Sequence, residues 1–216
     1  MPYIIPGTLT LFTTARAGSH AITNAVRALG AEQYGRHHGG YHCDDTFPRH
    51  LVANTLRITN IRSHYDILAR WRHFSSHAQR HPEETAAQFI RWFHANGPTD
   101  HTRRNHGILF QHAPHCDLFV RAERMTEDFA TVCRRIGRDP IPVPRQHETP
   151  GLPPDFTRQT FDAHAIDTLR ELYGEEMRQF GYYDPPWDAP GTHRNAPTID
   201  DLGGSDANHA EDGSAP

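Results

Sequence analysis

Residues 8–30 read TLTLFTTARAGSHAITNAVRALG. The first part, residues 8–14, is β-branched and apolar, which predicts a buried strand. The apolar residues of the last part recur at i, i+4 and i+7 from Ile22 to Leu29, and a glycine follows, which is typical of the end of a helix. The segment therefore predicts a strand, a short turn and a helix that begins near His20.

The turn between them, residues 13–20, is a predicted anion site. Backbone N–H groups and the positive end of the helix dipole converge where a strand leads into a helix. Arg16 adds a fork of donors, Gly18 lets the backbone approach a ligand closely, and Ser19 offers a hydroxyl. The pattern GxxxxGK[ST] of nucleotide triphosphatases is absent, which argues against ATP or GTP hydrolysis.

Strand-like and helix-like segments alternate along the rest of the chain. The sequence predicts strands at 54–61 and 116–122, and helices at 65–77, from about 82, at 126–136 and at 160–180. This alternation predicts an α/β fold with a parallel sheet. The stretch between the first helix and the second strand, residues 31–50, is rich in Gly, His, Asp and Arg and is expected to be a long loop.

The charge and cysteine content exclude several classes of protein. The 22 basic residues among 216 are all arginine, and the formal net charge is -4, which disfavours a general nucleic-acid binder. The three cysteines, Cys43, Cys116 and Cys133, form no CxxC pair, so neither a disulfide framework nor a cysteine zinc site is expected. No run of apolar residues is long enough for a membrane span. The expected location is the cytoplasm.

The chain is expected to form one domain, residues 1–187, followed by a tail at 188–216. The tail is acidic, rich in Pro and Gly, and almost free of large apolar residues. Such a segment cannot offset its ordering entropy by burial, so it is predicted to be disordered.

Four segments resemble motifs of the sulfotransferases that use 3'-phosphoadenosine 5'-phosphosulfate (PAPS). RAGSH at 16–20 resembles their 5'-phosphosulfate loop, R/K-S/T-G-S/T-T. IRSHYDILARW at 61–71 resembles their 3'-phosphate motif, V-R-N-P-x-D-x-x-x-S-W, with Ser-His for Asn-Pro and Arg70 for the serine. DLFVRAERMTEDF at 117–129 and LYGEEMRQFGY at 172–182 resemble two later segments of the family, whose role is expected to be architectural.

The resemblance implies a three-layer α/β/α fold of the P-loop nucleotide-binding type, with PAPS as donor and 3'-phosphoadenosine 5'-phosphate (PAP) as product. PAPS carries an anionic group at each end of its ribose, so a binder needs two separated cationic sites, which neighbouring strand ends of a parallel sheet can supply. The residues implied to bind the nucleotide are Arg16, Ala17, Gly18, Ser19, His20, Arg62 and Arg70. The acceptor is expected to be a small molecule or a carbohydrate with a free hydroxyl, and its identity and the oligomeric state are not encoded.

Catalysis of sulfuryl transfer needs charge stabilisation at the leaving oxygen and a base for the acceptor proton. Arg16 is expected to stabilise the leaving group by charge alone, because a guanidinium cannot serve as a proton donor. The loop at 35–42, GRHHGGYH, resembles an Arg-His-His stretch of some bacterial and viral family members, which makes His38 and then His37 the preferred bases. Asp44, Asp45 or a glutamate are alternatives.

Two other functions remain open at the level of sequence. His37, His38 and His42, with Asp44 or Asp45, could hold zinc or another divalent ion, although no HExxH pattern is present and the family's chemistry needs no metal. The fold could also bind a nucleotide without catalysing transfer, because positions 63, 64 and 70 depart from the family pattern.

Overall fold

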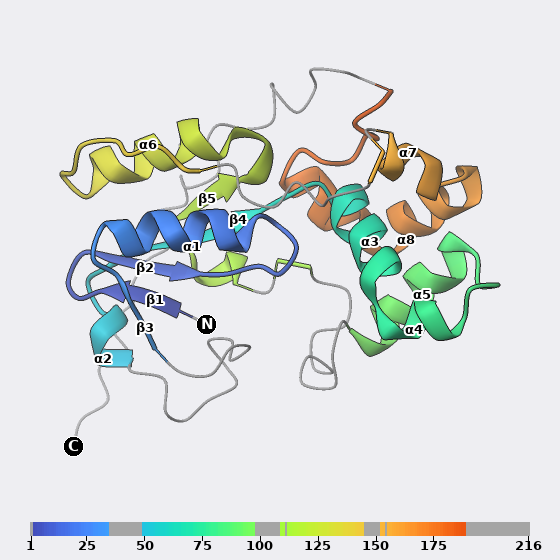
Figure 1. The fold of residues 1–216 in the computed structure, drawn as a ribbon, viewed down its shortest axis with the longest axis horizontal. Helices are drawn as coiled ribbons and strands as arrows, with labels where there is room; N and C mark the ends of the chain where they lie inside the picture. The colour runs from blue at the N-terminus through green and yellow to red at the C-terminus, as the bar shows by residue number, and fades with distance from the viewer. Residues whose placement is uncertain are drawn as a thin grey trace.

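The structure, a computed structural model, describes residues 2–34, 49–97, 109–110, 112–144, 152–153 and 155–188. These residues form a five-stranded sheet in the order β3-β1-β2-β4-β5 (Figure 1). Its strands are β1 (Pro2–Ile5), β2 (Leu9–Phe12), β3 (Glu32–Gln33), β4 (Leu56–Ile61) and β5 (Leu118–Arg121). The predicted α/β class is therefore confirmed.

The sheet is mixed, which corrects the prediction of a wholly parallel one. Strands β2, β4 and β5 run parallel to each other, whereas β1 is antiparallel to both β2 and β3. The reason is the short connection from β1 to β2, where Gly7 has a φ of 64° and the chain turns straight back on itself. The parallel half carries the turn at residues 13–18 and the start of the segment after β4.

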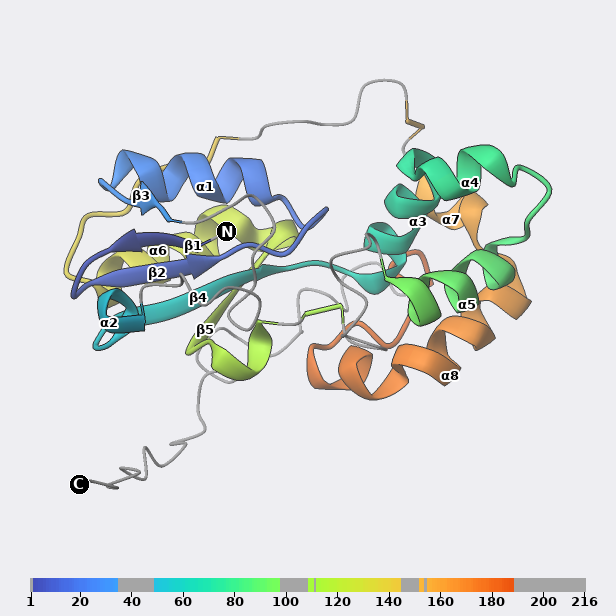
Figure 2. The same ribbon diagram turned by 90° about the horizontal axis from the view of Figure 1, so that it is seen from below.

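Two helices cover one face of the sheet, α1 (Ser19–Ala28) and α6 (Met125–Arg135) (Figure 2). Ile22 and Val26 of α1 and Phe129 and Val132 of α6 are fully buried there. They pack against inward-facing strand residues, namely Leu9, Leu11, Ile58, Leu118 and Val120. This apolar layer fixes the position of the α1 N-terminus relative to the strand ends.

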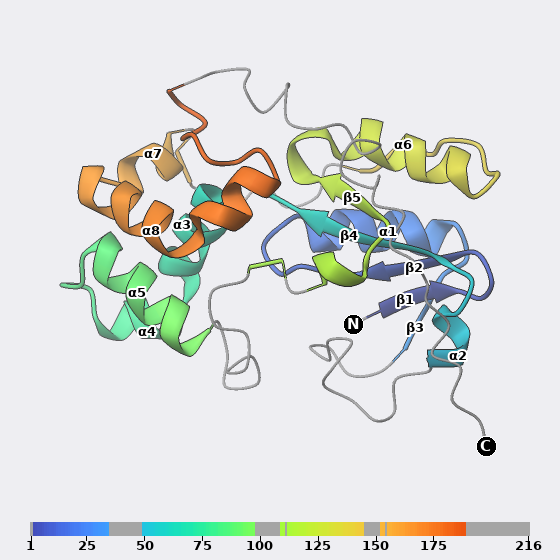
Figure 3. The same cartoon turned by 180° about the vertical axis from the view of Figure 1, so that it is seen from behind.

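The larger group of helices stands beyond the carboxyl end of β4 (Figures 1 and 3). It comprises α3 (His64–Phe74), α4 (Ser76–Arg80), α5 (Ala86–Asn96), α7 (Phe156–Thr160) and α8 (Ala163–Gln179). Side chains of α3, α5 and α8 share a core of their own. Among the described residues, the second face of the sheet is covered by shorter elements, α2 (Arg49–Val52), η2 (Ala113–His115) and the chain after α8, so a full third layer of helices is not seen.

Capping residues set the bounds of the predicted helices. The helix expected at 65–77 is split at Ser75, whose hydroxyl accepts the Ala78 N–H and starts α4. The helix expected at 160–180 corresponds to α8, which begins at Ala163 because the Asp162 carboxylate caps it through the Ala165 N–H, and α7 is a separate short helix before it. The helix expected from about 82 begins at Ala86, after a Thr85–Gln88 capping box.

The last described residues pack on the helical group. Trp187 contacts the Tyr65 ring with the ring centroids 5.4 Å apart. Of the predicted tail, only Asp188 belongs to the described residues, so its predicted disorder stays a prediction. No helix within the described ranges is both long and apolar enough to cross a membrane.

Candidate anion-binding site

The turn after β2 is tied to the neighbouring strand by Asn60, a fully buried residue of β4. The Asn60 Oδ1 accepts the Thr14 N–H at 2.9 Å. Its Nδ2 donates to the carbonyl oxygens of Thr14 at 2.9 Å and Ala17 at 2.8 Å. The side-chain amide therefore satisfies three buried backbone groups and holds the turn in one conformation.

Two residues of this turn have left-handed backbone, Arg16 with a φ of 64° and Gly18 with a φ of 79°. A Cβ at position 18 would lie 2.6 Å from the Met125 Cε, so a glycine suits both the φ and the close packing on α6. Gly18 directly precedes α1, whose first turn has neither a side-chain cap nor an acidic residue. This helix end is therefore electrostatically open to an anion.

The other predicted loop residues differ in exposure. Ala17 is fully buried and packs with Phe119 and Phe180, so only its backbone can face a ligand. Ser19 is half-buried at the first position of α1, and His20 is exposed. The prediction for the loop therefore concerns backbone at position 17 and side chains at positions 16, 19 and 20.

Arg16 reaches from this turn onto α3. Its guanidinium carbon lies 5.0 Å from the centroid of the Trp71 ring and 5.0 Å from that of the Phe74 ring. Partial burial lowers the pKa of Arg16 from its usual value, although the residue stays charged at any physiological pH. The aromatic contacts attract the guanidinium without neutralising it, because a ring quadrupole carries no net charge.

Arg62 follows β4 directly, before α3 begins. It pairs with Asp66, which lies in the first turn of α3. The Arg62 Nε donates to Asp66 Oδ2 at 3.2 Å, and the Thr157 hydroxyl of α7 donates to Asp66 Oδ1. Both charged side chains are about one-fifth exposed, at 23% for Arg62 and 21% for Asp66. The Asp66 carboxylate therefore orients Arg62 and anchors α7 to α3.

Arg70 is close enough to both Arg16 and Arg62 for their charges to act on it. Burial is the main cause that lowers the pKa of Arg70, and the charges of Arg62 and Arg16 lower it further, against the opposing effect of Asp66. The half-buried Arg70 side chain therefore interacts electrostatically with both of the other arginines. The structure brings Arg16, Arg62 and Arg70 into one region, and among the described residues Asp66 is the acidic group that offsets them.

Two glutamates distant in sequence fix the start of α3. The Glu123 carboxylate accepts the Ser63 N–H at 3.0 Å and the Tyr182 hydroxyl at 3.0 Å. Glu176 lies 2.8 Å from the His64 Nε2 and accepts the N–H groups of residues 109 and 110. Glu123 and Glu176 belong to the two later segments, 117–129 and 172–182, that resemble the family. These segments therefore supply the side chains that hold the start of α3, next to Arg62.

The residues that replace Asn-Pro in the family pattern are both enclosed. Ser63 and His64 are at most 1% exposed. Within the described residues, the Ser63 Oγ and the His64 Nδ1 have no hydrogen-bond partner. Position 63 therefore contributes its backbone, bonded to Glu123, and its hydroxyl does not cap α3.

The predicted bases, His37 and His38, lie outside the described residues, as do Asp44, Asp45 and His42. Their roles as base or as metal ligands therefore stay predictions. In the part of the chain that the structure describes, no three His, Cys, Asp or Glu side chains gather as a metal site would require.

Two residues of the site were missed at the level of sequence. Asn60 stands in the strand LRITNI, and asparagine is depleted in strands, so its presence there was the available signal. Phe74 gave no signal, because its contact with Arg16 joins segments far apart in the chain.

Comparison with known proteins identified no relative of this chain. No family model matches the chain, and no significant match was found among curated proteins or solved structures. The functional argument therefore depends on the residues and their arrangement.

Proposed function

We propose that this chain is a sulfotransferase that moves a sulfuryl group from PAPS to an acceptor hydroxyl. The observation that carries the proposal is the position of Arg70, where the charges of Arg16 and Arg62 both act on one guanidinium. Arg16 follows β2 and Arg62 follows β4. These two strands are adjacent and parallel, so their carboxyl ends meet at one edge of the sheet. Three guanidinium groups gathered in one region favour a ligand with several negative charges.

Arg16, Arg62 and Arg70 are called the arginine cluster below. In the proposed complex, the two ends of the nucleotide bind to different parts of this cluster. The 5'-phosphosulfate lies against the α1 N-terminus, with Arg16, the backbone of Ala17 and Gly18, and the Ser19 hydroxyl as donors. The 3'-phosphate lies between Arg62 and Arg70. Because Asp66 already orients Arg62, that side chain loses little conformational freedom on binding.

In the proposed reaction, the acceptor oxygen attacks sulfur in line with the leaving phosphate oxygen. The new O–S bond forms as the S–O bond to the 5'-phosphate breaks, and the released product is PAP. Arg16 stabilises the negative charge that develops on the leaving oxygen. The acceptor proton passes to a base, for which His38 and then His37 are the candidates from sequence.

Calorimetry with PAP tests the binding half of the proposal. Arg16→Ala and Arg62→Ala should each weaken PAP binding by about 1.5–3 kcal/mol, the size of a charge-assisted hydrogen bond. Arg134→Ala, which removes an exposed arginine from α6, is the control for net charge. Unchanged affinity in both cluster variants contradicts the proposal.

Transfer of label from sulfur-35 PAPS to a panel of hydroxyl compounds tests the catalytic half. A protein that binds PAP and labels no acceptor is a nucleotide-binding module, the alternative that the departures at Ser63, His64 and Arg70 favour. Loss of labelling in His38→Ala with retained PAP affinity assigns the base, whereas full activity in both His38→Ala and His37→Ala excludes them.

A further inference from the structure

A second site lies on a different side of α3 from the arginine cluster. The cavity has a volume of about 200 Å³, is open to solvent on one side, and is lined by residues of α3, α4, the turn after α4, and α7. Its lining residues are Ala69, Arg72, His73, Ala78, Gln79, His81, Pro82, Glu84, Phe156 and Thr160. Arg70 and Arg72 are separated by about 200° around the helix, so the two guanidinium groups leave α3 in nearly opposite directions.

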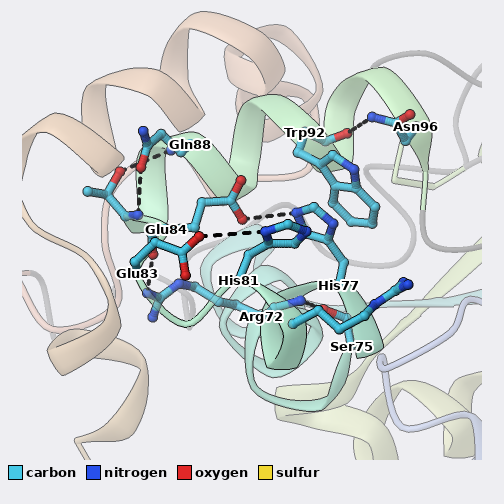
Figure 4. A network of polar contacts seen from close by, with 12 residues as sticks. Arg72, Ser75, His77, His81, Glu83, Glu84, Gln88, Trp92 and Asn96 are labelled. Atoms are coloured by element: carbon cyan, nitrogen blue, oxygen red, sulfur yellow. Dashed lines mark hydrogen bonds and ion pairs between the residues drawn. The ribbon is translucent and has the colours of Figure 1, made fainter.

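The walls of this cavity are held by a polar network (Figure 4). The Arg72 guanidinium donates to the Glu84 carbonyl at 2.8 Å, and His77 Nε2 lies 3.0 Å from the Glu84 carboxylate. The His77 ring stacks on Trp92 with the ring centroids 3.6 Å apart and the planes 5° from parallel. The turn from α4 to α5 is therefore fixed, and the cavity needs little reorganisation to accept a ligand.

The lining of the cavity contains one guanidinium, that of Arg72, and one carboxylate, that of Glu84. Glu84 faces His77, and Glu83 lies 3.6 Å from the His81 Nδ1. Arg72 is bonded to a carbonyl and, among the described residues, has no carboxylate partner. A guanidinium that already has its orientation but keeps its charge is suited to a carboxylate.

The rest of the lining is compact and largely uncharged. Phe156 presents an aromatic ring, with His73 against it at a centroid distance of 5.3 Å. Ala69, Ala78 and Pro82 add small apolar surface. The volume is below that of pockets for drug-sized ligands, so the cavity suits a molecule of about one ring.

We propose that this cavity binds a small organic monoanion, a carboxylate carried on one compact ring, with Arg72 holding the carboxylate and Phe156 contacting the ring. One guanidinium fork in the lining suits one carboxylate, in contrast to the multiply charged ligand proposed for the arginine cluster. The proposal does not depend on PAPS binding, because none of the three cluster arginines lines the cavity.

Benzoate and its uncharged counterpart benzamide are the probes, and the full chain is titrated by amide NMR. Benzoate should shift amide signals of residues 78–84 and bind at least tenfold more tightly than benzamide. In Arg72→Gln, which keeps a donor for the Glu84 carbonyl but loses the charge, this preference should disappear. Arg80→Gln makes the same change in charge on α4 outside the lining and should keep it.

Ala78→Leu fills the cavity while retaining Arg72, and it should abolish binding of both probes. Thermal unfolding of each variant checks that the fold is intact, and Ala78→Leu provides the test should Arg72→Gln not fold. The proposal is overturned if Arg72→Gln keeps the preference for benzoate. It is equally overturned if Ala78→Leu binds normally, or if the shifted signals belong to residues 14–20 instead.

Discussion

Arg16 is oriented by aromatic rings, whereas Arg62 is oriented by a carboxylate. Trp71 and Phe74 hold the Arg16 guanidinium at 5.0 Å from each ring centroid, and Asp66 pairs with Arg62. An acidic partner for Arg16 would compete with an anionic ligand for its donors. Aromatic orientation avoids this competition, so Arg16 keeps its charge for whatever anion binds beside the α1 N-terminus.

Trp71→Leu should therefore weaken only that part of nucleotide binding that depends on Arg16. We expect several-fold weaker binding of PAP and of adenosine 5'-phosphate, with little change for adenosine 3'-phosphate, because the 3' end is assigned to Arg62 and Arg70. Trp71→Phe should retain most of the affinity. Competition calorimetry with the three nucleotides measures the effect.

A double-mutant cycle separates orientation from general damage to the site. If Trp71 acts through Arg16, Trp71→Leu should cost little further affinity in an Arg16→Ala background. Equal losses for the 5' and 3' nucleotides, or additive effects of the two substitutions, would show that Trp71 has only a packing role.

At the scale of elements, local patterns predicted most strands and helices, and what was missed is either very short or depends on contacts distant in sequence. The β-branched run at 8–14 and the i, i+4 spacing after it correspond to β2 and α1. Because β2 and β4 were expected to be parallel neighbours, Arg16 and Arg62 could be expected at one edge of the sheet. Strand β1 has only four residues and was missed, although it pairs with its sequence neighbour β2. The contact of Phe74 with Arg16 joins residues distant in sequence and leaves no local pattern.

Asn60 is the residue that joins two of these elements. Asn60→Leu should remove the side-chain partner of the Thr14 N–H and of the Ala17 carbonyl, at about 1–3 kcal/mol for each group that stays unsatisfied, whereas the Thr14 carbonyl keeps the Ala17 N–H as a donor. We expect a lower free energy of unfolding in urea and weaker anion binding at the turn.

The control for this substitution is Asn96→Ala. Asn96 is exposed, and its amide donates to the Trp92 carbonyl on the surface of α5. A change in unfolding free energy for Asn60→Leu no larger than that for Asn96→Ala would contradict the role of Asn60 in fixing the turn.

The whole molecule carries its positive charge on arginine alone, which leaves tyrosine as the side chain that titrates near pH 10. Burial raises the pKa of Tyr65 to about 12. Burial also raises the pKa of Tyr173 and, with Glu123 as a second cause, that of Tyr182. The folded state therefore resists ionisation of these three phenols, whereas the unfolded chain does not.

This difference predicts alkaline unfolding. The neutral phenols contribute their full stability below about pH 10, where tyrosines of the unfolded chain begin to ionise. The contribution is lost as the pH rises further, toward about 12 for Tyr65. The urea midpoint should fall above pH 10, and part of the tyrosinate absorbance should appear only together with loss of circular dichroism. Ionisation of all seven tyrosines before any loss of structure would contradict this expectation.

The two glutamates at the start of α3 also have a consequence for how the protein is made. Glu123 bonds a residue 60 positions before it, and Glu176 one that lies 112 positions before it. During synthesis, α3 leaves the ribosome long before either carboxylate exists, so Ser63 cannot be fixed until Glu123 has emerged, nor His64 until Glu176 of α8 has. In a nascent chain stalled before residue 176, α1 and its turn should therefore be formed, while the start of α3 is not yet fixed.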